Sequence, residues 1–265
     1  MPGVYGFLRR PRWIAFSLLI VVLMVVMVNL GFWQLRRLDQ RQQANRAVTQ
    51  RSSEPIAPIA ELVKPTSDRA AVEAVQWRQI EATGTFDVAH EVFVRDRSLD
   101  GRAGLHAATP LVLADGTAIL VNRGWVPVPQ TVQGVPSAPP PPSGQVTVVG
   151  RLRPSQQRGL LGPTDPPVGV LVAFARLDVP RIQKQVPEPL LPAYVELTSP
   201  APTADLPKVL PLPELDDGPH LSYALQWFAF TVLAAIGWWL MARRTARQQT
   251  RPTGGLPPDI VPRGE

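Results

Sequence analysis

Residues 13–35 read WIAFSLLIVVLMVVMVNLGFWQL, and residues 221–242 read LSYALQWFAFTVLAAIGWWLMA. Neither run contains a charged side chain. About 20 apolar residues, each rising about 1.5 Å along a helix, cross the hydrocarbon core of a bilayer. The two runs therefore predict a membrane protein with transmembrane helices at residues 13–35 and 221–242.

The distribution of charge predicts how these helices are oriented. Residues 36–220 hold 19 basic and 19 acidic side chains, so the formal charge of +6 comes from the tails. The tails carry Arg9, Arg10, Arg12, Arg243, Arg244, Arg247, Arg251 and Arg263, offset only by Asp259 and Glu265. Positive residues beside a span favour the cytoplasmic side. We therefore expect a multi-pass protein of the cell (plasma) membrane with cytoplasmic tails at residues 1–12 and 243–265 and an extracytoplasmic segment at residues 36–220.

Two features of the chain leave alternatives to this topology. Four arginines follow the first run directly, namely Arg36, Arg37, Arg41 and Arg46, and on their own they make the direction of that helix ambiguous. The first run also resembles a secretory signal peptide, with a basic start and an apolar centre. Its length and the lack of a small-residue cleavage pattern after Asn29 favour an uncleaved signal anchor.

The segment between the runs has the pattern of a β domain. From Val75 onward, β-branched and aromatic residues alternate with polar ones between Gly and Asp turns, which is typical of strands. The expected strands are Val75–Phe86, His90–Arg97, Leu105–Leu113, Thr117–Val126, Gln145–Arg153, Val168–Phe174 and Ala193–Thr198. We predict a mainly antiparallel β domain, a barrel or a sandwich, with little helix. Because the chain contains no cysteine, this domain has no disulfides and depends on an ordinary apolar core.

Local signals refine this prediction. Asp115-Gly116 supplies the backbone conformation of a tight hairpin, and Asp178 and Pro180 predict a short helix to Gln185.

Residues 34–51 lack Gly and Pro, so the first helix should continue beyond the membrane, and residues 52–66 should form an extended connector. The proline-dense stretches 135–142 and 187–219 predict loops or sheet edges. The tail 248–265 is rich in Pro and Gly, which predicts disorder.

The sequence offers little catalytic chemistry. Cysteine is absent, and the three histidines, His90, His106 and His220, lie far apart in the chain. None of the nucleotide-binding, metalloprotease or nucleophile motifs occurs. We therefore expect no catalytic residues and no metal site built from clustered ligands. Nucleic-acid binding is also not expected, because the excess positive charge is confined to short membrane flanks.

Several short motifs are not explained by the membrane pattern. They are Gly31-Phe-Trp-Gln at the end of the first run, Gly104-Leu-His-Ala-Ala-Thr-Pro-Leu, Asn122-Arg-Gly-Trp-Val-Pro, Gly150-Arg-Leu-Arg-Pro, and His220-Leu-Ser-Tyr at the start of the second run. In this order and with this topology, the chain resembles the surfeit-locus (Surf/Shy type) family of cytochrome c oxidase assembly factors over about residues 25–240. The chain departs from that pattern at Gln40 and Arg41, where relatives often carry a Trp-Lys pair.

The resemblance implies a chaperone that helps to mature a haem-copper oxidase, with the catalytic subunit or its assembly intermediate as partner and haem a as possible cofactor. His220 begins the second helix, and spacings of three and seven place Tyr223 and Trp227 on its face. A neutral imidazole is a suitable axial iron ligand, and Arg37 or Arg123 would meet the propionates. The expected haem site is therefore His220, Tyr223, Trp227, Arg37 and Arg123.

Other interpretations of the same residues remain open. Tyr and Trp beside His220 are typical of the aromatic belt at a membrane surface, and Arg123 at a strand end can be a structural donor. A haem-independent scaffold would contact the oxidase through Trp33, Gln34, Trp125 and Gln226, and through small residues such as Gly237. A membrane-anchored partner of a receptor or transporter is a third possibility.

Overall fold

The computed structural model describes residues 5–128, 136–160, 162–200 and 205–249, and the chain divides into two units. Residues 1–44 and 216–265 form the first, which we call the helical unit, and residues 45–215 form the second, the β domain. Disorder was predicted for residues 248–265, but residues 248–249 belong to helix α5, so the prediction is wrong there. The rest of that tail and residue 135 of the first proline-dense stretch lie outside the described residues.

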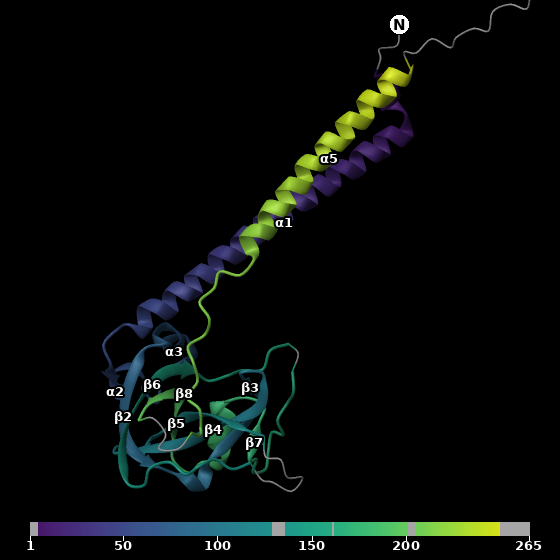
Figure 1. Cartoon of the computed structure of the whole chain (residues 1–265). Coiled ribbons are helices and arrows are strands. Elements are labelled where there is room, and N and C mark those ends of the chain that lie inside the picture. The colour runs from purple at the N-terminus through teal and green to yellow at the C-terminus, as the bar shows by residue number, and fades with distance from the viewer. Residues whose placement is uncertain (1–4, 129–135, 161, 201–204, 250–265) are drawn as a thin grey trace, which may run out of the picture. The chain divides into compact units, whose positions relative to one another are not determined.

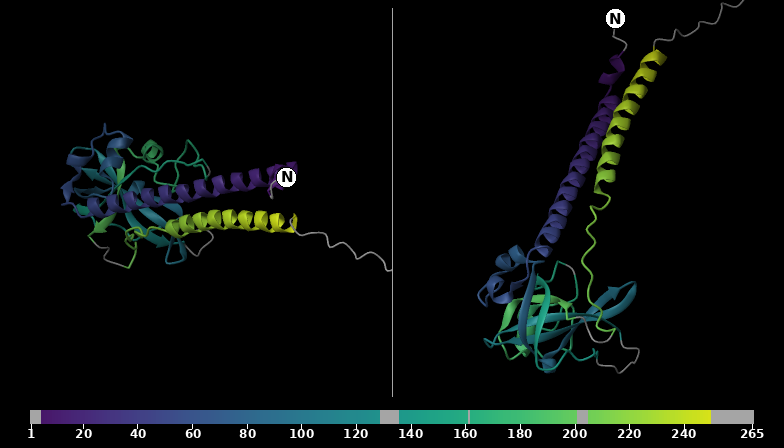
Figure 2. Two further views of the ribbon diagram at one scale, coloured as in Figure 1. Left: turned by 90° about the horizontal axis from the view of Figure 1, so that it is seen from above. Right: turned by 60° about the vertical axis from the view of Figure 1, so that its left-hand side comes forward.

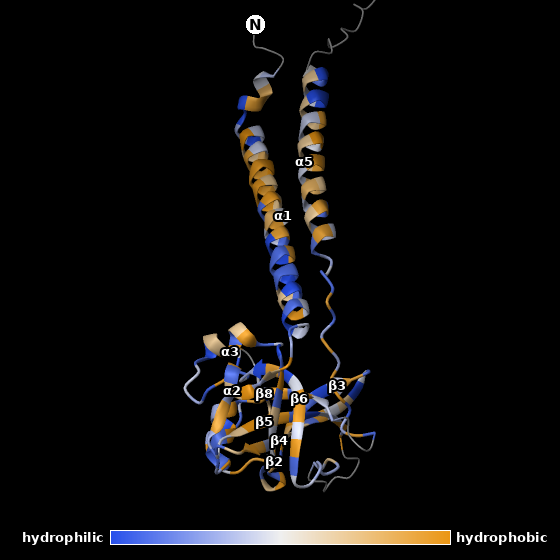
Figure 3. Cartoon of the chain, turned by 90° about the vertical axis from the view of Figure 1, so that its left-hand side faces the viewer, coloured by the Kyte–Doolittle hydropathy of each residue, from blue (hydrophilic) through white to orange (hydrophobic). Residues whose placement is uncertain are grey.

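The helical unit consists of a short 3-10 helix, η1 (Gly6–Arg9), and two long helices, α1 (Pro11–Ser52) and α5 (His220–Gln249). Both long helices are long and apolar enough to cross a membrane, as the two runs predict. Figure 3 shows that α1 is apolar in its first part and polar toward its C-terminal end. The helix continues through the polar segment to Ser52, which confirms the prediction from the lack of Gly and Pro there.

Within the helical unit, α1 and α5 lie side by side, as Figures 1 and 2 show. A Cβ at Gly31 would lie 2.6 Å from the ring of Phe228, so only glycine permits this approach. At the other end, the indole nitrogen of Trp238 donates to Oγ of Ser17 at 3.0 Å, and Phe7 is buried against the last turns of α5. Helices in lipid associate through this kind of close packing and polar contact.

The β domain is a closed five-stranded barrel with added edge strands (Figure 1). Its strands are β2 (Gln79–Phe86), β6 (Gln145–Pro154), β8 (Leu190–Ser199), β5 (Ala118–Pro127) and β4 (Arg102–Leu113). They pair in that order, and β4 closes the barrel by pairing with β2. The barrel is mainly antiparallel, as predicted, whereas β5 and β8 run parallel.

Further elements extend the barrel. The strands β1 (Ala57–Pro58), β3 (Val92–Leu99) and β7 (Ala173–Phe174) pair at its edges. The helices are α2 (Ile59–Leu62), α3 (Arg69–Val75), η2 (Val88–His90), α4 (Val179–Ile182) and η3 (Gln183–Gln185). The inward side chains of β2, β5, β6 and β8 fill the barrel, and α4 packs with β3, β5 and β7 on its outside. Closure leaves the barrel strands without free edges, which makes the domain a stable support.

The local signals for turns and helix starts are confirmed. Gly116 has φ +80° in the turn between β4 and β5, and Asp115 accepts a hydrogen bond from the Thr117 amide at 2.9 Å. Asp178 caps α4 by accepting from the amide of Arg181. In both cases the side chain accepts from a backbone amide two or three residues later in the chain, so the signal in the sequence is local.

Several predictions about elements are wrong. Residues 75–78 do not belong to a strand, because α3 ends at Val75 and β2 begins at Gln79. The connector 52–66 contains β1 and α2, and only residues 173–174 of the expected strand 168–174 pair in the sheet. The stretch 187–219 is also more than loop, since β8 lies between two other strands, with the register irregular near Pro192, where the chain lacks an N–H donor.

Two glycines explain the close contact between strands and connector in this domain. Gly104 lies against the indole of Trp125, where a Cβ would overlap the ring nitrogen. Gly124 has φ +129° and lies against the carbonyl of Lys208. Trp125 and Lys208 exchange two backbone hydrogen bonds of 2.8 Å, so the segment that follows β8 is fixed to the end of β5.

The stability of the β domain should depend on pH through His106. This side chain lies on β4, its Nδ1 accepts from the Asn122 amide at 3.3 Å, and burial, followed by the charge of Arg97, lowers its pKa to about 4. The unfolded chain, with a histidine pKa of about 6.5, then binds more protons than the folded chain between about pH 4 and 6.5. Stability should be complete above this window and fall by at most about 3 kcal/mol as pH decreases through it.

Denaturant unfolding of the purified protein at several pH values measures this effect, with the His106→Gln variant as comparison. We expect the variant to show a smaller change of unfolding free energy between pH 6.5 and pH 4. An unchanged slope in the variant would show that other groups cause the pH dependence.

Candidate functional site

The helical unit joins two of the predicted site residues directly. Nδ1 of His220, at the first position of α5, lies 2.8 Å from Oε1 of Gln34 on α1. With the amide oxygen as acceptor, Nδ1 carries the proton and Nε2 keeps its lone pair. Ligand histidines in metal proteins are generally oriented in this way, by donating their other ring N–H to a neighbouring group. Gln34 therefore holds His220 in the tautomer and orientation that a ligand histidine requires.

The other predicted residues of the helical unit lie beside this pair. Tyr223 is exposed and Trp227 is partly buried, with its ring in edge contact with Phe230 at 6.2 Å. Trp33 is exposed, and the guanidinium of Arg37 lies over its ring, 5.7 Å from the centroid. Aromatic and cationic groups thus flank the His220–Gln34 pair and remain accessible.

Of the proposed contact residues on α5, Gln226 is exposed, and a Cβ at Gly237 would have no neighbour within 4 Å. Neither residue is therefore used in packing α5 against α1.

An ion pair and a hydrogen bond extend this contact to the residues just before α5. The Arg41 guanidinium contacts the Asp216 carboxylate at 3.1 Å, and the Gln42 amide donates to Asp217 at 2.9 Å. The exposed Arg41 pair adds little stability by itself, but it fixes the residues immediately before α5 to the same face of α1. The start of α5 and the residues just before it are thus held by three side chains of α1, those of Gln34, Arg41 and Gln42.

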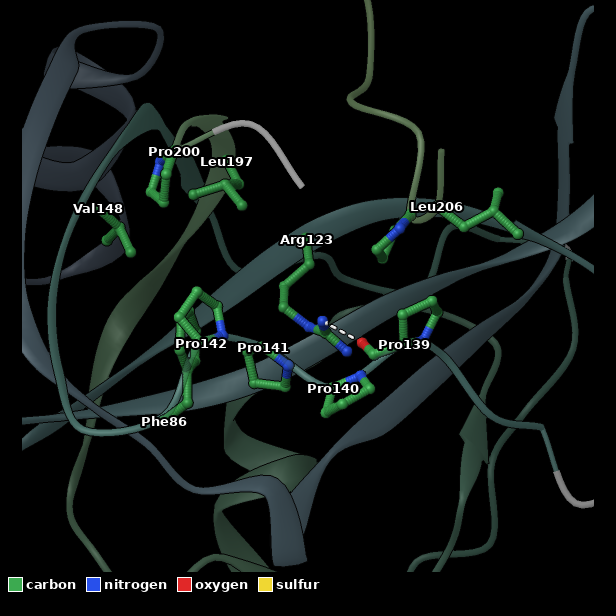
Figure 4. Close-up of a pocket in the computed structure, with 11 residues that line it drawn as sticks. Phe86, Arg123, Pro139, Pro140, Pro141, Pro142, Val148, Leu197, Pro200 and Leu206 are labelled. Carbon is green, nitrogen blue, oxygen red and sulfur yellow. Dashed lines mark hydrogen bonds between the residues drawn. The ribbon is translucent and has the colours of Figure 1, made fainter. Parts of the chain in front are cut away.

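Arg123 belongs to the β domain, where its guanidinium is fully used (Figure 4). It is 4% exposed and ion-pairs with Glu91, while Nε donates to Thr109 at 2.9 Å and Nη1 to the carbonyl of Pro139 at 2.7 Å. A buried charge is tolerated when it is paired and hydrogen-bonded in this way. Arg123 therefore connects β5 to β4, to Glu91 before β3, and to the proline-dense segment 136–142.

A pocket of about 460 Å³ lies at this end of the barrel. Figure 4 shows Arg123 between prolines of two connecting segments. The lining is mostly apolar and comprises Phe86, Arg123, Pro139, Pro140, Pro141, Pro142, Val148, Leu197, Pro200, Leu206 and Pro207. The guanidinium of Arg123 is already paired with Glu91, Thr109 and Pro139, so it does not offer the pocket a free cation. The pocket is therefore an apolar hollow and not an anion site.

Trp125 is buried and holds a second network together. Its indole covers Gly104, and its backbone pairs with Lys208. On strand β6, which β8 separates from β5, Nη2 of Arg151 donates to the carbonyl of Leu210 at 2.6 Å, and its Nε lies 3.4 Å from Glu196. Trp125 therefore supports the chain that leads to α5 and does not present an exposed surface to a partner.

The sequence did not indicate several residues of these networks. Glu91 and Thr109 complete the environment of Arg123, and Glu196 pairs with Arg151. Each is an ordinary strand residue whose partner is far away in the chain. One signal was available. A buried arginine, such as that of the Asn122-Arg-Gly-Trp motif, needs a carboxylate partner, so an acidic residue had to lie nearby.

Comparison with known proteins identifies the family. The model of the SURF1 family matches residues 21–232. The chain belongs to the SURF1 family. An uncharacterised SURF1-like protein of Mycobacterium tuberculosis (strain ATCC 25618 / H37Rv) is 32% identical over 260 residues, which cover 97% of this chain and 93% of the relative.

Two relatives of this SURF1-family chain have more specific names. The cytochrome oxidase assembly protein SHY1 of Saccharomyces cerevisiae is 30% identical over 142 residues, covering 52% of this chain and 35% of the yeast protein. The surfeit locus protein 1 of Xenopus tropicalis is 26% identical over 165 residues, covering 56% of this chain and 52% of the frog protein. The matched region of the SURF1-family chain begins within α1 and ends within α5, the two helices that are long and apolar enough to cross a membrane.

The Arg123–Glu91 pair yields a test that separates a structural role from ligand binding. Arg123→Met should destabilise the β domain by about 3–5 kcal/mol, because it leaves the Glu91 carboxylate buried without its partner. The double variant Glu91→Met/Arg123→Met should recover most of this loss, since no charge is then buried. Thermal unfolding followed by tryptophan fluorescence measures both effects. A double variant as unstable as the single one would contradict the structural role.

Proposed function

We propose that the chain is a membrane-bound assembly factor for a haem-copper cytochrome c oxidase and assists delivery of haem a to the catalytic subunit. Membership of the SURF1 family and the name of the yeast relative support the assembly role. The observation that supports the haem step is the hydrogen bond between His220 and Gln34, which leaves Nε2 of the imidazole with its lone pair. The partner is then the catalytic subunit or an assembly intermediate that contains it.

The residues of the helical unit fit a haem group. Nε2 of His220 would hold the iron, and Gln34 keeps the ring in the correct tautomer. Tyr223 and Trp227 offer aromatic contact to a hydrophobic macrocycle, and Arg37 offers a cation to a propionate. Bound haem would supply the iron that this imidazole would coordinate. Arg123 is not needed for this interaction, because each of the three nitrogens of its guanidinium already has a partner in the β domain.

The proposed location is the plasma membrane, with both termini in the cytoplasm and the β domain outside. The support is the charge of the flanks. In the described part of the N-terminal flank, residues 5–12 carry three arginines and no acidic residue, and Arg243, Arg244 and Arg247 follow the apolar part of α5. Such flanks favour the cytoplasmic side. Haem would then meet His220 at the outer surface of the membrane.

A haem-independent scaffold is the second candidate function. The exposed Trp33 and Gln226 favour it, because the packing of α1 against α5 uses neither side chain. Aromatic and amide groups exposed on membrane helices are suited to contacts with further helices. In this function, Gln34 and His220 serve only to pair α1 with α5.

Complementation of a strain that lacks the chain separates the two functions. His220→Ala should restore less oxidase than the wild type and should retain less haem a when purified from cells that make haem a, because the axial ligand is missing. His90→Ala is the matched control, since His90 lies in the β domain beside Asp87. Reduced-minus-oxidised spectra of membranes and of the purified protein measure both quantities.

The possible results have distinct meanings. Loss of haem a from the purified His220→Ala variant with loss of oxidase supports delivery. A haem-free variant that still co-purifies with the catalytic subunit and restores oxidase would support the scaffold. Normal oxidase in the strain without the chain would contradict both functions.

A further inference from the structure

A loop of the β domain combines exposed apolar side chains with a group of cations. Between β6 and α4, Leu160, Val168 and Val170 are 101%, 74% and 82% exposed, respectively. These values are the highest among the exposed large apolar side chains of the described residues. Soluble surfaces tolerate single exposed apolar residues, but a group of them on one loop indicates a surface that meets an apolar phase or a partner.

Four cations surround a hollow at the base of this loop. They are Arg158, Arg176, Arg181 and Lys184, and the hollow has a volume of about 740 Å³. Their nitrogens donate to carbonyl oxygens of the loop: Arg158 to Gly162 at 3.3 Å, Lys184 to Pro167 at 3.2 Å, and Arg181 to Gly169 at 2.9 Å. The cations therefore hold the loop through neutral acceptors, and these bonds do not compensate their charge.

The two carboxylates that also line the hollow are engaged elsewhere. Asp165 contacts Arg95 at 3.1 Å and accepts from the amide of Ala175, while Asp178 caps α4. Within the described ranges, no carboxylate lies within ion-pair distance of the four cations. Arg181 is 8% exposed, its guanidinium lies over Phe174, and its Nη1 is buried without a hydrogen-bond partner among the described residues. Asp165 is paired with Arg95, and the charge of Asp178 offsets one of the four cations, so the hollow keeps a net positive charge that an external anion would balance.

We propose that this loop is a docking surface for an anionic phospholipid bilayer. The exposed apolar side chains of the loop would enter the interfacial region of the bilayer. Arg158, Arg176 and Lys184 would contact lipid phosphates, each contributing about 1 kcal/mol to binding. The way the domain is connected favours a bilayer over an acidic protein as the partner of this loop. The β domain continues at both ends into helices able to cross a membrane, so a bilayer is always present at high effective concentration.

The absence of cysteine allows a direct test on the full chain. Val170→Cys, labelled with an environment-sensitive fluorophore, reports the loop in nanodiscs of phosphatidylcholine alone or of phosphatidylcholine with phosphatidylglycerol. Spin-labelled phosphatidylcholine is the quencher. We expect a blue shift and quenching in the discs that contain phosphatidylglycerol. Val88→Cys, exposed on η2 of the same domain, should show neither effect.

Charge variants determine whether the cations cause the contact. Arg158→Gln/Arg176→Gln/Lys184→Gln should lower the ratio of bound to free loop by roughly a hundredfold, at about 1 kcal/mol per cation. Lys64→Gln/Arg102→Gln/Lys208→Gln, which removes the same charge from exposed positions elsewhere in the domain, should keep the contact. Arg181 is left in place because its packing on Phe174 supports the fold.

Three results would overturn the proposal. They are no quenching at Val170→Cys in either disc, equal quenching in both discs, and quenching that survives the first triple variant but not the second. A fluorophore that becomes shielded only when a purified oxidase subunit is added would assign the loop to a protein partner instead.

Discussion

The pairing of α1 with α5 is the contact on which the candidate site depends. Apolar helices gain no hydrophobic stabilisation by leaving lipid for each other, so their pairing requires specific contacts. Here the contacts are the close approach of Gly31 to Phe228, the Trp238–Ser17 hydrogen bond and the His220–Gln34 hydrogen bond. The last of these joins residues 186 positions apart. Without the helix pair, His220 would be one more polar side chain at a membrane surface.

The β domain requires a different kind of contact. Its barrel closes through β2 and β4, and Arg123 then connects three elements at one end through a buried ion pair and neutral acceptors. This architecture explains several of the short motifs in the sequence. Gly104 makes room for Trp125, and Gly124 makes room for Lys208. These residues fix the segment that returns the chain to α5, so much of what resembled a functional motif is structural.

The sequence predicted the architecture because its signals are local. Two uncharged runs predict spans, and Asp115 and Asp178 indicate a turn and a helix start because their side chains accept from backbone amides two or three residues later. It did not predict that Gln34 bonds to His220, or that Glu91 pairs with Arg123, because the partners are distant in the chain. The prediction of a strand at 168–174 was wrong for a similar reason. The apolar residues of Val168-Gly-Val-Leu-Val suit a strand, but a strand also needs a neighbour to pair with, and only residues 173–174 have one.

Crosslinking of the two helices in membranes tests the account most directly, and the chain has no native cysteine to interfere. The variant Gln34→Cys/His220→Cys should be joined rapidly by a short thiol-specific crosslinker, because the two side chains are in contact. The variant Gln34→Cys/Phe230→Cys, with the second cysteine at an exposed position of α5, should react much more slowly. Equal rates for the two variants, or no crosslink in the first, would contradict a site built on the pairing of α1 with α5.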